Sequence, residues 1–294
     1  MADSQKQTVQ WFPGHMAKTR RLIKESLSLV DGVTELLDAR IPMSSRNPEL
    51  DELTGRKPRI VLLNKCDVAD DSITKEWIEY FKRRGQYALA VDCRTGKGLN
   101  QYHNLVRQVL ADRIKANEER GMPGKALRIM VVGIPNTGKS SFINRMAGKN
   151  RAKVADKPGV TRHNQWFAIG NGIELLDTPG VLWPKFDDPE VGYKLSFIGS
   201  VKDEVTDVET MAARLVKVLA EDYEDKLTGR YKLKNISDIK GAMPWELLEE
   251  IGRERGMLIR GGEVNMERVS VMLLDEYRGG KMGKISFERP SQYK

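Results

Sequence analysis

Short apolar runs alternate with amphipathic stretches through the first two thirds of this 294-residue chain. The amphipathic stretches predict helices at 15–30, 72–84, 99–120 and 139–148. The apolar runs predict six strands at 32–38, 59–65, 87–93, 127–133, 164–170 and 172–177. The last two strands flank Asn171-Gly172, a pair typical of hairpin turns. This alternation favours an α/β fold, with a mostly parallel six-stranded sheet and helices on both of its faces.

The pattern changes after about Trp183, where the predicted strands stop. Apolar residues then recur on single helical faces, and the expected helices are at 206–227, 245–255 and 264–277. The sequence therefore predicts two domains. The first is an α/β domain over 1–185, and the second is a small, mostly helical domain over 186–294.

Charge and cysteine usage narrow the function classes. The net charge of +8 favours a polyanionic partner, although residues 200–294 carry 17 basic against 18 acidic side chains. Two cysteines fit a reducing cytoplasm and argue against a disulfide scaffold or a structural zinc site. The N-terminus lacks the apolar core of a signal peptide, and no apolar run is long enough to span a bilayer. We therefore expect a cytoplasmic protein with no membrane partner.

The fourth predicted strand leads into "GIPNTGKSS" (133–141), which matches the phosphate loop G-x-x-x-x-G-K-[ST]. Glycines there let backbone N–H groups approach phosphates at the N-terminus of the next helix. Lys139 would reach the β- and γ-phosphates, and Ser140 would bind Mg²⁺. The other nucleotide contacts expected from this loop come from Asn136, Thr137, Gly138 and Ser141. The alternative is an ordinary glycine-rich turn between a strand and a helix.

Two segments further along the chain fit the switches of a nucleotide hydrolase. "DTPG" (177–180) follows an apolar strand about forty residues after the phosphate loop. Asp177 would hold Mg²⁺ through water, and the Gly180 amide would sense the γ-phosphate. Between the two motifs, Thr161 would close over Mg²⁺ and the γ-phosphate, unless it is an ordinary loop threonine.

The strand at 59–65 ends in Asn-Lys-Cys-Asp (64–67), the N-K-x-D pattern of a guanine-reading loop. The Asp67 carboxylate would accept hydrogen bonds from guanine N1–H and N2–H₂, a pair of donors that adenine lacks. Lys65 would lie over the base, and Asn64 would tie this loop to the phosphate loop. After the next strand, "VDCRTG" (91–96) resembles a base-supporting loop. The further residues expected around the base are Cys66, Asp92, Cys93 and Arg94.

These elements run in the order base loop, base-support loop, phosphate loop, switch I and switch II. This is the usual order of a GTPase, except that the two base loops come before the phosphate loop and the switches instead of after them. Chain ends lie at the surface and are often close together, so a domain can be cut and rejoined without changing its sheet. The sequence therefore predicts a circularly permuted P-loop GTPase domain.

The chain resembles the bacterial ribosome biogenesis GTPase A family (the YlqF type) over nearly its whole length. The segments that carry the resemblance are "QWFPGHMAK" (10–18), "DARIPMSSRNP" (38–48), "LLNKCD", "GIPNTGKSS", "PGVTR", "LLDTPGVLWPKF" (175–186) and "GKISFERP" (283–290). The resemblance implies a GTPase that binds the large (50S) ribosomal subunit precursor and its rRNA. It would drive a late step of assembly, with hydrolysis stimulated by the subunit, and its helical C-terminal domain would bind RNA.

Details of catalysis follow from the same resemblance. Val181 stands where Ras-like proteins carry a water-positioning Gln, so slow intrinsic hydrolysis is expected. His15 in "FPGHMAK" is the candidate substitute, unless it only packs or contacts RNA, and His163 is a second candidate. Asn136 resembles the Asn of potassium-activated GTPases, whose carbonyl helps bind K⁺. GDP and guanosine alarmones are expected inhibitors, and the protein is expected to be a monomer.

Three alternatives stay open on the sequence alone. A GTP-gated RNA-binding factor acting on the small subunit or on tRNA would carry the same motifs. An ATP-using P-loop enzyme, such as a kinase, is disfavoured by Asp67. A scaffold that has lost nucleotide chemistry is disfavoured by the intact Lys139, Ser140 and Thr161.

Overall fold

The computed structural model describes residues 21–55, 57–148, 165–180, 188–201, 203 and 206–293. Contacts within the chain divide it into two compact units. The sheet unit comprises the described residues from 21 to 180 together with 286–293, and the helical unit is Asp188–Ile285. None of the described helices combines the length and apolar character needed to cross a bilayer.

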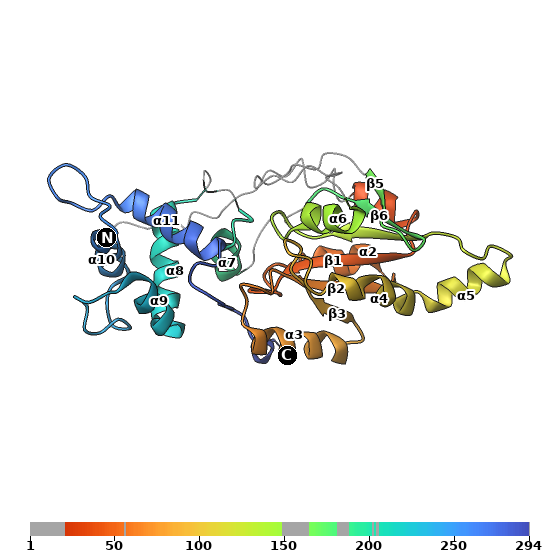
Figure 1. Cartoon of the computed structure of the whole chain (residues 1–294), viewed down its shortest axis with the longest axis horizontal. Helices are drawn as coiled ribbons and strands as arrows, with labels where there is room; N and C mark the ends of the chain where they lie inside the picture. The colour runs from red at the N-terminus through yellow and green to blue at the C-terminus, as the bar shows by residue number, and fades with distance from the viewer. Residues whose placement is uncertain are drawn as a thin grey trace. The chain divides into compact units, whose positions relative to one another are not determined.

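Six strands form one sheet in the order β3-β2-β1-β4-β6-β5 (Figure 1). All neighbours are parallel except β5, which is antiparallel to β6. The strands are β1 (Gly32–Asp38), β2 (Arg59–Asn64), β3 (Tyr87–Ala90), β4 (Leu127–Val132), β5 (Gln165–Ala168) and β6 (Ile173–Asp177). The predicted mostly parallel six-stranded sheet is confirmed. β3 is shorter than expected because Asp92 already pairs with Lys97 across a turn.

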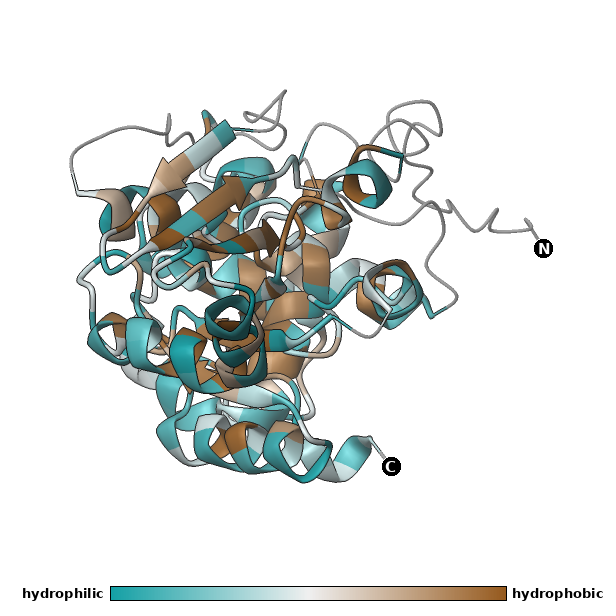
Figure 2. Ribbon diagram, turned by 90° about the vertical axis from the view of Figure 1, so that its right-hand side faces the viewer, coloured by the Kyte–Doolittle hydropathy of each residue, from teal (hydrophilic) through white to brown (hydrophobic). Residues whose placement is uncertain are grey.

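Helices cover both faces of the sheet because its central strands are apolar on both sides. On β2, Ile60 and Leu62 join one core, whereas Val61 and Leu63 join the other. The first core includes side chains of α4 (Tyr102–Val109) and α6 (Lys139–Ala147), and the second includes side chains of α3 (Asp71–Arg83). Figure 2 shows the hydrophobic strands between helices whose outer faces are hydrophilic.

Several helical details differ from the sequence prediction. The stretch predicted as one helix over 206–227 forms two, Val208–Asp222 and Glu224–Tyr231, and the helix Pro189–Phe197 was not predicted. The stretch predicted as one helix over 99–120 is divided into η1 (Leu99–Gln101), α4 and α5 (Ala111–Glu119). The break falls at Leu110, whose φ of −104° and ψ of 21° are not helical. The short helix α2 (Glu49–Thr54) was not predicted, since its six residues make fewer than two turns and bury only Leu50 and Leu53 as apolar side chains.

The helical unit consists of helices packed around their own apolar core, with α11 lying against α8 and α10. Its helices are α7 (Pro189–Phe197), α8 (Val208–Asp222), α9 (Glu224–Tyr231), α10 (Pro244–Glu254) and α11 (Met266–Arg278). Leu219, Ile251 and Leu273 are fully buried. The predicted small, mostly helical second part of the fold is therefore confirmed.

The last residues of the chain do not stay with the helical unit. Residues 286–293, which include η3 (Pro290–Gln292), belong to the sheet unit and contact α3. The prediction had placed 186–294 in one domain, so the observed division differs from it over this tail. The tail belongs to the sheet unit because buried contacts hold it against α3. In one of them, Trp77 Nε1 on α3 donates a hydrogen bond to the Glu288 carbonyl over 3.0 Å.

Candidate nucleotide-binding site

The predicted nucleotide loops all follow the carboxyl ends of strands, at one edge of the sheet. The phosphate loop follows β4, and the base-support loop follows β3. The guanine loop 64–67 begins at the last residue of β2, and the segment 177–180 begins at the last residue of β6. From β1 the chain adds β2 and β3 on one side, then crosses over to place β4, β6 and β5 on the other. Ligands of open α/β sheets bind in the crevice where the strand order reverses in this way.

The phosphate loop curves around the ammonium group of Lys139. Asn136 and Gly138 both take positive φ, of 61° and 96°, and so bend the backbone between β4 and α6. Lys139 Nζ donates to the carbonyls of Gly133 and Ile134, over 2.9 and 3.0 Å. Burial lowers the pKa of Lys139 to about 8, although the nearby Asp177 carboxylate opposes this shift. A buried cation inside a curved backbone is suited to phosphate.

Glycine is needed where the neighbouring loops approach the phosphate loop. A Cβ at Gly180 would lie 2.7 Å from Lys139 Nζ and 3.1 Å from the backbone nitrogen of Pro135. A Cβ at Gly138 would lie 2.2 Å from Asn64 Nδ2. The glycine of "DTPG" therefore lies directly against the phosphate loop, as a sensor of the terminal phosphate must.

The Asn64 side chain joins three loops. Its Nδ2 donates to the Thr137 carbonyl of the phosphate loop over 2.7 Å, and its Oδ1 accepts from the Cys93 amide over 3.0 Å. The predicted link between the base loop and the phosphate loop is therefore present. The second bond, to the base-support loop, was not predicted. Together they hold the guanine-side loops in register with the phosphate side.

Asp67 and Arg94 meet across the base loops. Arg94 Nη2 donates to Asp67 Oδ2 over 3.1 Å, and the Asp67 side chain keeps 27% of its surface exposed. Asp92 shapes the supporting loop, because its carboxylate accepts from the Arg94 amide at 2.8 Å and from Thr95 Oγ1 at 2.5 Å. Hydrogen bonds from these groups lower the pKa of Asp92 against the opposing effect of burial.

Cys66 and Cys93 lie in these two loops as free, buried thiols. Burial raises the pKa of both thiols, so both are protonated at neutral pH. Neutral thiols are weak nucleophiles, and this favours a packing role for both side chains over a redox role.

A buried charge cluster behind Lys65 was missed by the sequence analysis. Lys65 has a φ of 61°, and its Nζ lies 3.1 Å from Asp38 Oδ2. Arg40 also pairs with this carboxylate, through Nε at 2.9 Å and Nη2 at 2.8 Å. Burial alone would raise the pKa of Asp38, but Arg40 and Lys65 hold it well below its usual range. Asp38 and Arg40 stand in the quoted "DARIPMSSRNP" segment, which carried no chemical signal of its own.

The residues at the phosphate edge fit a magnesium ion. Within the described residues, no cluster of three or more His, Cys, Asp or Glu could hold a metal ion by itself. Mg²⁺ in nucleotide sites takes one or two protein oxygens and completes its shell with water and phosphate. Ser140, which lies in the first turn of α6, and the buried Asp177 are oxygen donors of that kind.

Three predicted catalytic residues, His15, Thr161 and His163, lie outside the described residues. The same holds for Val181. The predictions about the attacking water and about switch I therefore stay predictions. Ser141 lies in the first turn of α6, directly after Ser140.

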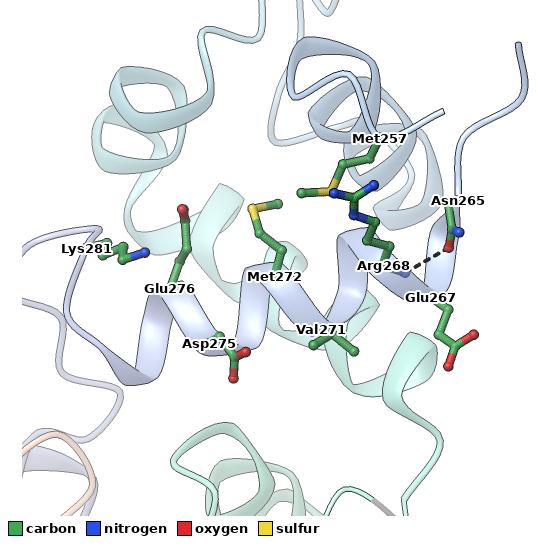
Figure 3. Close-up of a pocket in the computed structure, with 9 residues that line it drawn as sticks. All are labelled: Met257, Asn265, Glu267, Arg268, Val271, Met272, Asp275, Glu276 and Lys281. Carbon is green, nitrogen blue, oxygen red and sulfur yellow. Dashed lines mark hydrogen bonds between the residues drawn. The ribbon is translucent and has the colours of Figure 1, made fainter. Parts of the chain in front are cut away.

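The helical unit has a cavity of its own, of about 560 Å³ (Figure 3). Met257 and Met272 point into it, with Arg268 beside them and Lys281 near its other end. Carboxylates of α11 complete the lining, so the wall mixes apolar and charged groups of both signs. Among the residues that the structure describes, none of those predicted to contact the nucleotide lines this cavity.

Comparisons with known proteins agree with these motifs. The family model described as "50S ribosome-binding GTPase" matches residues 128–241. "Ribosome biogenesis GTPase A" of Priestia megaterium is 47% identical over 97% of this chain and 98% of the relative. The protein of the same name from Thermotoga maritima is 34% identical over 96% of this chain and 95% of the relative.

Two solved structures are also similar to this chain. A GDP-bound structure of TM YlqF superimposes with a TM-score of 0.64 and 31% identity, covering 92% of this chain and all of that one. A GNP-bound YlqF from T. maritima superimposes with a TM-score of 0.63 and 30% identity, covering 93% and 98%.

Proposed function

This chain belongs to the ribosome biogenesis GTPase A family, and from that premise we propose that it acts on the precursor of the large (50S) ribosomal subunit. It binds the precursor and its rRNA and uses GTP hydrolysis to drive a late assembly step in the cytoplasm, acting as a monomer. The observation that carries the proposal is the Asn64 side chain, which joins a guanine-reading loop to a phosphate loop. The 50S partner rests on the description of the matching family model.

The residues divide the work between base and phosphates. Asp67 accepts the guanine N1–H and N2–H₂ groups, Lys65 covers the base, and Arg94 closes the supporting loop. Lys139 and the phosphate-loop amides stabilise the negative charge that shifts during γ-phosphate transfer. Ser140 would hold Mg²⁺, with Asp177 acting through water, and the ion would neutralise phosphate charge. Guanosine alarmones share the guanine and 5′-diphosphate of GDP, and we include them as inhibitors of this site.

Turnover by the protein alone is proposed to be slow. The residue after Gly180 is Val181, whose side chain cannot orient a water molecule. A subunit that completes the site would then raise the rate, and GTP turnover with purified large subunits tests this. The second candidate is a GTP-gated factor for another RNA, such as the small subunit or tRNA. Stimulation by small subunits would favour it.

Potassium should stimulate hydrolysis through Asn136. This residue takes a positive φ of 61° within the phosphate loop, where its carbonyl could join the shell of a K⁺ ion. A cation there would stabilise the transition-state charge, and we expect turnover about tenfold or more higher in K⁺ than in Na⁺. Turnover is measured in matched chloride buffers. Asn136→Gly keeps the positive φ but removes the side-chain carbonyl, so this variant should lose the preference for K⁺. Equal wild-type rates in both salts would refute the K⁺ site.

A further inference from the structure

We propose that the C-terminal tail, residues 286–293, is a positioning part of the guanine site and that Glu288 is its anchor. The inference rests on the guanine-nucleotide binding proposed above and extends it to residues more than two hundred positions away from the base loop. The tail contacts two segments that lie next to residues 64–67, one near in space and one next in the chain. One flank is the loop 39–48 after β1, and the other is the start of α3.

Glu288 fixes the loop 39–48 through a buried carboxylate. The residue is 0% exposed, and its carboxylate accepts hydrogen bonds from the Met43 amide at 2.8 Å and the Ser44 amide at 3.2 Å. The Ser44 hydroxyl donates to the same carboxylate. Burying a charge is costly unless donors satisfy it, so these bonds define one position for the loop.

The loop passes this constraint to Lys65. Ser45, next to Ser44, accepts a hydrogen bond from the Asp38 amide over 3.0 Å. Arg40 pairs with the Asp38 carboxylate, while its carbonyl accepts from the tail's Phe287 amide over 2.8 Å. Asp38 in turn holds Lys65 Nζ at 3.1 Å. Each step from Glu288 to the lysine of the guanine loop is therefore a direct contact.

The tail also fixes the segment that follows Asp67. Ser286 Oγ accepts from the Asp70 amide over 3.0 Å, and Asp70 caps α3 by accepting from the Ser72 and Ile73 amides. Further along the tail, the Tyr293 ring lies 5.6 Å from that of Trp77 on α3. The tail thus contacts the segment after Asp67 directly, and it reaches Lys65 through the loop 39–48 and Asp38.

This arrangement favours a functional role because a base-reading loop needs exact placement before its ligand arrives. Lys65 already takes a positive φ, which residues other than glycine adopt at a cost. Contacts that hold it there reduce the ordering cost of binding and so raise affinity. The tail directly follows Ile285, the last residue of the helical unit.

The test compares three full-length variants with the wild type: Glu288→Gln, Ser44→Ala and the control Gln292→Ala. Gln292 is exposed on the same tail, and its side-chain oxygen accepts only the Arg289 amide among the bonds described for it. The measurements are the Kd and dissociation rate of a fluorescent GDP, the KM and kcat for GTP, and the melting temperature. Ser44→Ala removes one hydroxyl and keeps the test open if Glu288→Gln folds poorly.

We expect Glu288→Gln to raise the Kd for GDP and the KM for GTP about tenfold, mainly through faster dissociation. Ser44→Ala should shift the same constants about threefold, and kcat should stay within about twofold in both variants. Gln292→Ala should match the wild type. A lower melting temperature with unchanged Kd and KM would make the tail a structural clasp and overturn the inference. Failure of the wild type to bind GDP would instead refute the proposed function.

Discussion

Asp67→Asn should change the nucleotide preference of this protein from guanine to xanthine by about a thousandfold. The carboxylate accepts two hydrogen bonds from guanine, and each bond to a charged group contributes about 1.5–3 kcal/mol. The Asn amide keeps one oxygen that can accept from guanine N1–H, but its NH₂ group faces the guanine N2–H₂ group, so one bond is lost and two donors oppose each other. Xanthine carries an oxygen at position 2, which accepts from the new amide.

The Asp67 side chain is accessible in the structure. Its side chain is 27% exposed, and Arg94 occupies one carboxylate oxygen from the other loop. The preference is measured by displacing a fluorescent nucleotide with GDP and with XDP, and the affinity for a guanosine alarmone should fall in parallel with that for GDP. Asp71→Asn, an exposed residue four positions further on, removes the same charge and should change nothing. Unchanged GDP affinity in Asp67→Asn would refute the guanine-reading role.

Lys139→Ala should lower GTP turnover about a thousandfold at saturating nucleotide. Its ammonium is the buried cation at the centre of the phosphate loop, 2.9 Å from the Gly133 carbonyl. Burial lowers the pKa of this lysine, so the folded protein holds the proton less tightly than the unfolded chain does. The charge therefore costs stability at neutral pH, and its removal should leave the melting temperature nearly unchanged or higher.

Measuring turnover and melting temperature separately distinguishes a catalytic role of Lys139 from a role in folding. Lys125→Ala, an exposed lysine before β4, removes the same charge and should keep full activity. Turnover of Lys139→Ala within tenfold of the wild type would contradict the phosphate role. A collapse in melting temperature together with activity would show that Lys139 is needed for folding, and the account of its lowered pKa would then be wrong.

The sheet and the nucleotide loops could be predicted from the sequence because their signals are local. Each strand is a short apolar run, and each loop carries its motif within four to nine residues. A link from Asn64 to the phosphate loop was predicted from the motifs, and the structure makes it through the Thr137 carbonyl. The rotated motif order also predicted the permuted domain, and the predicted mostly parallel six-stranded sheet is observed.

The support of the guanine loop could not be predicted because it depends on contacts between distant residues. Glu288 and Ser44 are 244 positions apart, and no periodicity in either segment indicates that they meet. Asp38 ends a buried strand, where an acidic residue suggests a ligand as readily as an internal ion pair with Arg40. The resemblance implied RNA binding by the whole C-terminal domain, whereas the buried contacts of residues 286–293 place this tail on α3.

GTP turnover in potassium buffer, with and without purified large ribosomal subunits, tests the central claim most directly. Small subunits serve as the control. We predict slow turnover alone, stimulation of about a hundredfold or more by large subunits, and no stimulation by small subunits. Turnover unchanged by large subunits, or raised equally by small subunits, would contradict a GTPase activated by the large subunit.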